Sequence, residues 1–299
     1  MEKLINPFEV EGNWYKGNTH THTTRSDGKI EPQDKIKQYA DAGYDFLALT
    51  DHFRTYDPTE FDALTLTLIP GIEFHPQHPT SKTGPWHMIA LDVDHQEDKF
   101  SGEVSAQLFV DKFKKQGGFM ILCHPNWCGF SRQELTFING MDAFEVYNYT
   151  CEVNTAKGDS SNEYDSMLMN GHQLTAIACD DSHQNHDAFG GWLKVKAKDS
   201  SKESIMEALR SGAYYASSGP DFKNIKISDD KISVETTPVK SIKFIGYAQS
   251  GKLIKAEKGS FVEEGEFEIP KYNSEHGYVR VQIEDEEGGK AWSQPVFTS

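Results

Sequence analysis

Short apolar runs alternate with amphipathic stretches as far as about residue 218 of the chain. The apolar runs are rich in β-forming residues, which predicts strands. They cover residues 14–18, 45–50, 66–74, 87–93, 118–123, 143–147 and 174–179. Helical spacing follows Pro32 and recurs in residues 105–116 and 201–211. This alternation predicts an α/β fold with a parallel sheet, which can close as a barrel.

The pattern changes after Gly219 and Pro220, where short β-forming runs are separated by turn signals. These runs cover residues 222–227, 231–236, 241–246, 251–256, 266–269, 278–284 and 291–297. Their spacing predicts a small antiparallel sandwich. We therefore expect two domains, residues 1–219 and residues 220–299.

The composition fits a globular protein and argues against several classes. Of 299 residues, 37% are hydrophobic, and we find no apolar run near the roughly 20 residues that cross a bilayer. Residues 1–10 lack the basic segment and apolar run of a signal peptide, so we expect a cytoplasmic protein with no membrane partner. The 30 Lys and Arg residues against 46 Asp and Glu residues give a net charge of −16, which argues against duplex nucleic acid as a partner. A homo-oligomer is compatible with the sequence.

Histidines and acids gather at the ends of the apolar runs. His20 and His22 are two residues apart, so an extended backbone points both imidazoles to one face. Side chains at the carboxyl ends of parallel strands meet at one edge of a sheet. The full set is His20, His22, Asp27, His52, Glu73, His87, His124, Asp181 and His183. Because clustered ionisable groups are costly without a compensating cation, this set predicts a metal centre.

The residue types narrow the choice of metal. None of the nine candidates is a cysteine, which excludes a thiolate-rich structural zinc site. Mixed imidazole and carboxylate ligands suit Zn, Mn or Fe. The chain has four cysteines and no CxxC pair, so we expect free thiols rather than a disulfide framework.

The same segments resemble the PHP family, the polymerase and histidinol phosphatase superfamily. The matching strings are HTHTTRSDG, ALTDH, GIE, WHMIALDV, LCHPN and CDDSH, which span residues 18–183 in the order of the family. The resemblance implies a distorted seven-stranded (β/α) barrel that carries two or three divalent ions. It also implies membership of a subgroup with a C-terminal β-domain.

The resemblance further implies how the ions share their ligands. The expected sets are His20, His22, Glu73 and Asp181 for one ion, the bridging Glu73 with His87 and His124 for a second, and Asp27, His52 and His183 for a third. His75 and His78 are alternatives to His87. We favour His87 because it begins a strand, whereas the other two lie in a Pro-rich loop.

Such a centre favours hydrolysis of a small phosphate ester or nucleotide by in-line attack of a metal hydroxide. The sequence has no GxSxG elbow and no GxxxxGK[ST] loop. Asp51 and Asp180 adjoin candidate ligands, so we expect them to orient an imidazole or accept a proton. Arg54 is a candidate for holding a phosphate oxygen. The other candidate cations are Lys16, Arg25 and Arg132.

Two other functions stay open at this point. The same centre suits hydrolysis of an amide or a carbamate-like ester. Alternatively, the protein is a metal-loaded binding module in which the C-terminal β-domain does the binding. Residues 75–85 are a candidate lid. The candidates for stacking on a substrate ring are Trp86, Trp127, Tyr147, Tyr149 and Trp192.

Overall fold

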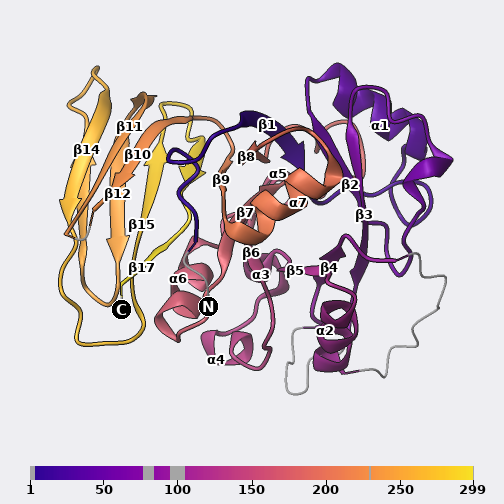
Figure 1. Cartoon of the computed structure of the whole chain (residues 1–299), viewed down its shortest axis with the longest axis horizontal. Coiled ribbons are helices and arrows are strands. Elements are labelled where there is room, and N and C mark those ends of the chain that lie inside the picture. The colour runs from indigo at the N-terminus through magenta and orange to yellow at the C-terminus, as the bar shows by residue number, and fades with distance from the viewer. Residues whose placement is uncertain (1–3, 77–83, 95–104, 229, 299) are drawn as a thin grey trace.

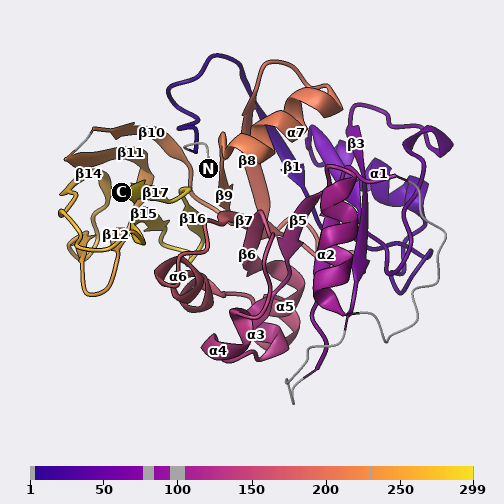
Figure 2. The same ribbon diagram turned by 60° about the horizontal axis from the view of Figure 1, so that its bottom comes forward.

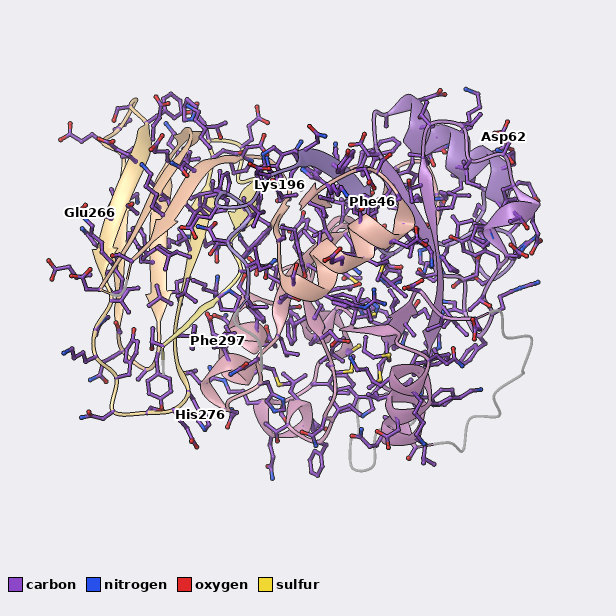
Figure 3. The ribbon with its side chains drawn as sticks, viewed as in Figure 1. Phe46, Asp62, Lys196, Glu266, His276 and Phe297 are labelled. Atoms are coloured by element: carbon purple, nitrogen blue, oxygen red, sulfur yellow. The ribbon has the colours of Figure 1, made fainter. Side chains whose placement is uncertain are left out.

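The structure is a computed structural model that describes residues 4–76, 84–94, 105–228 and 230–298. His78 and most of the candidate lid, residues 75–85, lie outside the described residues. Two lobes lie side by side along the longest axis (Figure 1). Phe46 points into the interior of one lobe, whereas Asp62 and Glu266 are exposed at opposite ends of the molecule (Figure 3).

Each of the seven apolar runs contains a strand, so the predicted strands of the first lobe are confirmed. They are β1 (Asn13–Asn18), β2 (Phe46–Leu49), β3 (Thr67–Phe74), β4 (Met88–Leu91), β5 (Phe119–Leu122), β6 (Ala143–Asn148) and β7 (Thr175–Cys179). The predicted helices form as α1 (Pro32–Asp41), α2 (Ala106–Lys115) and α7 (Lys202–Ser211). Strands β2, β4, β5 and β7 are buried along their whole length, as expected of strands covered on both faces.

The sequence pattern did not reveal several further elements. They are the 3₁₀ helix η1 (Pro58–Glu60), α3 (Pro125–Cys128), α4 (Arg132–Leu135), α5 (Tyr149–Thr155), α6 (Ser161–Met169), β8 (Trp192–Ala197) and β9 (Tyr214–Ser217). In strand β8, half-buried residues alternate with buried ones. Its lysines interrupt the apolar run that marks the other strands, so the sequence pattern did not reveal it. Most of the missed helices have seven residues or fewer, too short for a helical period to stand out.

The sheet of the first lobe contains the expected parallel pairs, β1–β2, β2–β3, β5–β6 and β6–β7, together with antiparallel pairs. Its order is β9-β8-β1-β2-β3-β4-β5-β6-β7. Strand β4 is antiparallel to both β3 and β5, and β8 is antiparallel to β1.

The two ends of this sheet curve toward each other. Strand β7 packs against β8 and β9. Thr21, just after β1, forms a parallel bridge with Ser182, just after β7. Helix α2 lies over the sheet (Figure 2). The rings of its Phe109 and Phe113 pack on Phe74 at centroid distances of 4.6 and 5.4 Å. The sheet therefore wraps round an apolar core, while a closed seven-stranded barrel stays a prediction.

The C-terminal lobe is antiparallel, as the sequence predicts. Its strands are β10 (Phe222–Ile227), β11 (Lys231–Val239), β12 (Ser241–Gly246), β13 (Gly251–Lys255), β14 (Val262–Glu268), β15 (Gly277–Glu284), β16 (Lys290–Trp292) and β17 (Val296–Thr298). Strands β10, β11 and β14 form one sheet, and the others form a second. Ile232 and Val234 of the first sheet share a core with Phe244 and Val281 of the second. Strand β16 pairs with β9, so the second sheet is continuous with that of the first lobe.

A buried ion pair fastens the two lobes together. Arg280 on β15 donates two hydrogen bonds to the carboxylate of Asp165 on α6, through Nε and Nη2, both at 2.7 Å. The Arg280 side chain is 1% exposed. Lys290 pairs with Asp159 at 2.6 Å, and Trp292 Nε1 donates to Ser161 Oγ at 3.0 Å. The C-terminal lobe therefore rests on the segment around the start of α6.

The Asp165→Asn variant leaves the guanidinium of Arg280 buried without its carboxylate. We expect the free energy of unfolding to fall by about 3–5 kcal/mol, as when one side of a buried pair is removed. Urea denaturation followed by circular dichroism measures the loss. The control Glu263→Gln breaks an exposed pair with Lys223 and should cost less than about 1 kcal/mol. Equal losses in the two variants would contradict the role of the Arg280 pair.

Candidate metal centre

The nine predicted ligands lie at one rim of the first lobe, just beyond the ends of its strands. Backbone pairing continues past the regular strands there. His22 N donates to Ser182 O at 3.0 Å, and Asp181 N donates to His20 O at 2.9 Å. An isolated bridge joins His52 to Glu73. Segments far apart in the sequence are thus held in register where the ligands emerge.

Two of these ligands have a left-handed backbone. His124 has φ 30° and Asp181 has φ 56°. Such conformations cost residues other than glycine about 1–3 kcal/mol each and persist only where the surroundings impose them. The surrounding fold therefore imposes the backbone conformations that place the side chains of His124 and Asp181 in the rim.

The first group brings together His20 Nε2, His22 Nε2, Glu73 Oε2 and Asp181 Oδ1. Five of their six mutual separations are 3.0–3.2 Å. The centre of a tetrahedron with edges of about 3.1 Å lies about 1.9 Å from each corner, close to the roughly 2.0–2.2 Å of Zn–N and Zn–O bonds. All four residues are buried. The geometry of these donors fits one divalent cation.

The second group uses the other oxygen of Glu73. His87 Nδ1 lies 2.8 Å and His124 Nε2 lies 3.7 Å from Glu73 Oε1. Glu73 is 1% exposed. Its two oxygens face two different sets of imidazoles. The structure thus brings His87 to Glu73, as the strand pattern predicted, but it also brings His75 Nε2 to 3.7 Å from the same oxygen.

The third group surrounds Asp27, whose side chain is 56% exposed. His52 Nε2 lies 3.4 Å from Asp27 Oδ2, and His183 Nε2 lies 3.4 Å from Asp27 Oδ1. His22 Nδ1 lies 3.7 Å from Asp27 Oδ1. This group is the more open side of the centre.

Hydrogen bonds fix which nitrogen of two histidines faces the centre. His20 Nδ1 donates to Glu145 Oε1 at 2.7 Å, and His183 Nδ1 donates to the backbone oxygen of Asp181 at 2.7 Å. In both rings Nε2 is therefore the nitrogen that faces the other ligands. This arrangement is the usual support of a metal-binding imidazole.

Three buried polar atoms of the rim have no hydrogen-bond partner among the described residues: His52 Nδ1, His75 Nε2 and Asp181 Oδ1. Buried polar atoms are nearly always satisfied, so each such exception calls for an explanation. All three belong to groups of donors that could hold a metal ion. The orphaned atoms, the donor types and the spacing agree with binding of divalent metal.

The charges of the rim are strongly coupled. Burial alone would raise the pKa of Glu73, but the imidazoles of His52 and His20 outweigh burial and hold it well below its usual range. Burial alone would lower the pKa of His52, but Glu73 and Asp27 raise it to about 10. The same balance, through Asp181, Glu145 and Glu73, raises the pKa of His20. In the metal-free protein, protons on the imidazoles of His20 and His52 supply the positive charge that metal ions would otherwise supply.

Asp51 and Asp180 support backbone segments of the rim. Asp51 accepts hydrogen bonds from Thr23 N at 2.8 Å, Thr23 Oγ1 at 2.7 Å and Ser26 Oγ at 2.7 Å, which holds the turn between His22 and Asp27.

Asp180 is buried below the rim, and burial raises its pKa to about 6. Its carboxylate accepts from Asn18 Nδ2 at 2.8 Å, from Tyr39 Oη at 2.6 Å and from the backbone nitrogens of residues 189–191 at 2.8–2.9 Å. Those contacts stabilise the loop that carries His183. The expected contact of Asp51 or Asp180 with an imidazole is not among these bonds.

A cleft of about 400 Å³ opens over the rim. Its described lining holds no Lys or Arg. Arg54 is exposed and outside this lining, so its phosphate role stays a prediction. Arg25 pairs with Glu60 at 2.6 Å, and Lys16 packs over the rings of Tyr44 and Trp192. Arg132 is exposed on α4.

Of the five aromatic candidates for stacking, Trp127 is the one in the described lining of the cleft. It is 41% exposed, and its ring meets His87 and His124 edge-on at centroid distances of 5.6 and 5.1 Å. Trp86 is fully buried against Phe130. The remaining candidates, Tyr147, Tyr149 and Trp192, lie elsewhere.

Sequence reasoning missed Glu145, which is fully buried beneath the rim. Besides binding His20, it accepts from His124 N at 2.9 Å and from Asn148 Nδ2 at 3.1 Å. Asn148 also donates to Asp181 Oδ2 at 3.2 Å. The available signal was an acid inside the otherwise apolar run of β6, where a charge needs a buried partner.

No protein-family model matches the sequence, and no curated protein matches it. Among solved structures, the chain is similar to a two-domain protein from Bacteroides vulgatus that contains a predicted PHP-like metal-dependent phosphoesterase. The identity is 18%, the TM-score is 0.53, and the match covers 95% of this chain and 94% of that one. This likeness shows a shared two-lobed fold.

Two further structures resemble part of the chain. A proposed metal-dependent phosphoesterase from Bifidobacterium adolescentis is 14% identical, with a TM-score of 0.45, over 66% of this chain and 96% of that one. A lesion-specific endonuclease from Pyrococcus furiosus is 11% identical, with a TM-score of 0.45, over 66% of this chain and 56% of that one. No helix in the described part of the chain is long and apolar enough to span a membrane.

Metal uptake by the metal-free protein should release protons. The raised pKa of His52, about 10, means that its ring is protonated at neutral pH and must lose that proton to bind a cation. Affinity for Zn²⁺ or Mn²⁺ should therefore rise as the pH increases toward about 10. Calorimetric titrations in two buffers with different ionisation enthalpies measure the protons released. Metal uptake without proton release would contradict the assignment of His52 as a metal ligand.

The Glu145→Gln variant weakens the hydrogen bond that orients His20. We expect metal affinity to fall by about 10–100-fold, as for other residues that support a metal-binding histidine. Equilibrium dialysis with metal analysis by mass spectrometry measures the change. Glu207→Gln, on the exposed face of α7, is the matched control and should bind like the parent. Indistinguishable affinities in the two variants would remove Glu145 from the centre.

Proposed function

We propose that the chain is a metal-dependent phosphoesterase of the PHP type, which hydrolyses a small phosphate ester or nucleotide. The observation that carries the proposal is the buried carboxylate of Glu73, whose two oxygens face two different sets of imidazoles. A shared carboxylate of this kind suits adjacent cations acting on one substrate group. The similarity to a protein that contains a predicted PHP-like phosphoesterase supports the same reaction class.

We assign the ligands to three adjacent cation positions. The sets are His20, His22, Glu73 and Asp181, then Glu73, His87 and His124, and then Asp27, His52 and His183. Zn, Mn and Fe suit these ligands. Occupancy of two or all three positions is part of the proposal.

Divalent cations held here supply Lewis acidity, which activates water near neutral pH and offsets charge on a phosphoryl group. The chain's own residues orient the metal ligands. Glu145 and the backbone oxygen of Asp181 aim the imidazoles of His20 and His183. Asp51 holds the turn that carries Asp27, and Asp180 holds the loop that carries His183. With these positions fixed in advance, little reorganisation is needed as charge develops.

The cleft favours a small substrate with little charge beyond its phosphoryl group. The described lining contributes no Lys or Arg, so neutralisation of the substrate falls to the cations at its floor. The net charge of −16 also disfavours long polyanions. A cytoplasmic location is consistent with this proposal. The proposal also fits substrates other than duplex nucleic acid.

The His22→Ala variant removes a ligand of the first set, which also lies beside Asp27 of the third. With Mn²⁺ or Zn²⁺ restored, hydrolysis of bis-p-nitrophenyl phosphate or a phosphomonoester should fall by about a hundredfold or more, because charge stabilisation is lost. Release of p-nitrophenol or phosphate measures the rate. His276→Ala removes a histidine of the C-terminal lobe (Figure 3) and should leave the rate unchanged.

The wild-type protein decides between phosphoester hydrolysis and its alternatives. A metal-loaded sample that cleaves amides or carboxyl esters, and no phosphoester in a broad panel, would replace the proposed reaction class. A loaded sample that cleaves neither class while it binds a partner independently of His22 would favour a binding module.

A further inference from the structure

A seventh imidazole, that of His75, lies within the rim but outside the three sets assigned above. It follows the end of β3, two residues beyond Glu73, so both side chains emerge on the same face of the strand. His75 Nε2 lies 3.7 Å from Glu73 Oε1, and His75 lines the cleft. The ring is 22% exposed, so solvent reaches part of it.

The nitrogen of His75 that faces Glu73 is buried and has no hydrogen-bond partner among the described residues. The same holds for His52 Nδ1, which lies 3.1 Å from Glu73 Oε2 without the alignment of a hydrogen bond. Two orphaned nitrogens therefore flank one ionised carboxylate. Ligand atoms of His52, Glu73 and His75 all lie within 4.8 Å of one another.

Neighbouring rings hold His75 in this orientation. His87 stacks on it at a centroid distance of 4.0 Å and an interplanar angle of 23°. His52 and Phe53 meet it edge-on at 4.3 and 4.9 Å. Phe53 itself has a left-handed backbone, with φ 58°. The packing therefore fixes the ring with its free nitrogen toward Glu73, and little entropy remains to be lost on binding a ligand.

We propose that His75 is a further metal ligand, and that with Glu73 and Nδ1 of His52 it forms a fourth donor group for a divalent cation. This proposal rests on the metal centre of the proposed function but not on the reaction it catalyses. The group differs from the third set because it uses Nδ1 of His52 rather than Nε2, which faces Asp27. One carboxylate and two imidazoles suit Zn²⁺, Mn²⁺ or Co²⁺.

Metal titration tests the proposal without reference to activity. Metal-free full-length wild type, His75→Ala, His75→Gln and the control His276→Ala are titrated with Co²⁺, followed by visible absorption and by metal analysis after dialysis. We expect His75→Ala and His75→Gln to lose one class of bound Co²⁺, or to bind it at least about tenfold more weakly, with a changed d–d spectrum. His276→Ala should match wild type, and circular dichroism checks that each variant is folded.

Matching isotherms and spectra for wild type and both His75 variants would overturn the proposal. A raised KM for phosphoester hydrolysis with unchanged metal uptake would also overturn it, because His75 would then contact substrate rather than metal. Failure of the proposed function has a different signature. Wild type would then bind Co²⁺ and lose it on His75 substitution, yet hydrolyse no phosphoester.

Discussion

The buried carboxylate of Glu73 is the interaction on which the metal-binding rim depends. Its oxygens lie 2.8–3.2 Å from nitrogens of four imidazoles, which reach it from three segments of the chain. An anion so far from water is tolerated only with compensating positive charge, supplied by protons or by metal ions. The same demand favours binding of divalent cations and is the reason that proton release is expected on binding.

The rest of the first lobe acts to keep that carboxylate and its neighbours still. Glu145 fixes the ring of His20 from below, and Asp51 and Asp180 fix the loops rather than the rings. The C-terminal lobe contributes at longer range. Through Lys290 and Trp292 it contacts Asp159, between α5 and α6, and Ser161, at the start of α6, while α5 forms one wall of the cleft. Displacement of the C-terminal lobe is therefore expected to move the α5 wall of the cleft first and the metal ligands only afterwards.

Local patterns predicted the strands well because each buried strand of the first lobe is a short apolar run that reads clearly without its neighbours. Strand direction was harder to predict. The antiparallel course of β4 depends on where β3 and β5 lie, which no local pattern shows. Strand β8 escaped notice because its lysines face solvent, a division of faces that only the packed sheet defines. Glu145 was missed for the same reason, since one acid in an apolar run has meaning only beside its partner His20.

By itself, the sequence determined which residue types stand at the ends of the strands, and alternation along extended chain determined that pairs such as His20 and His22 share a face. That much is local stereochemistry. Only the tertiary structure decided which of these side chains meet, that Glu73 serves several imidazoles at once, and that His75 joins them while Arg54 stays outside. Those outcomes depend on sheet curvature and on pairing between distant segments, and no run of neighbouring residues encodes a distance across the fold.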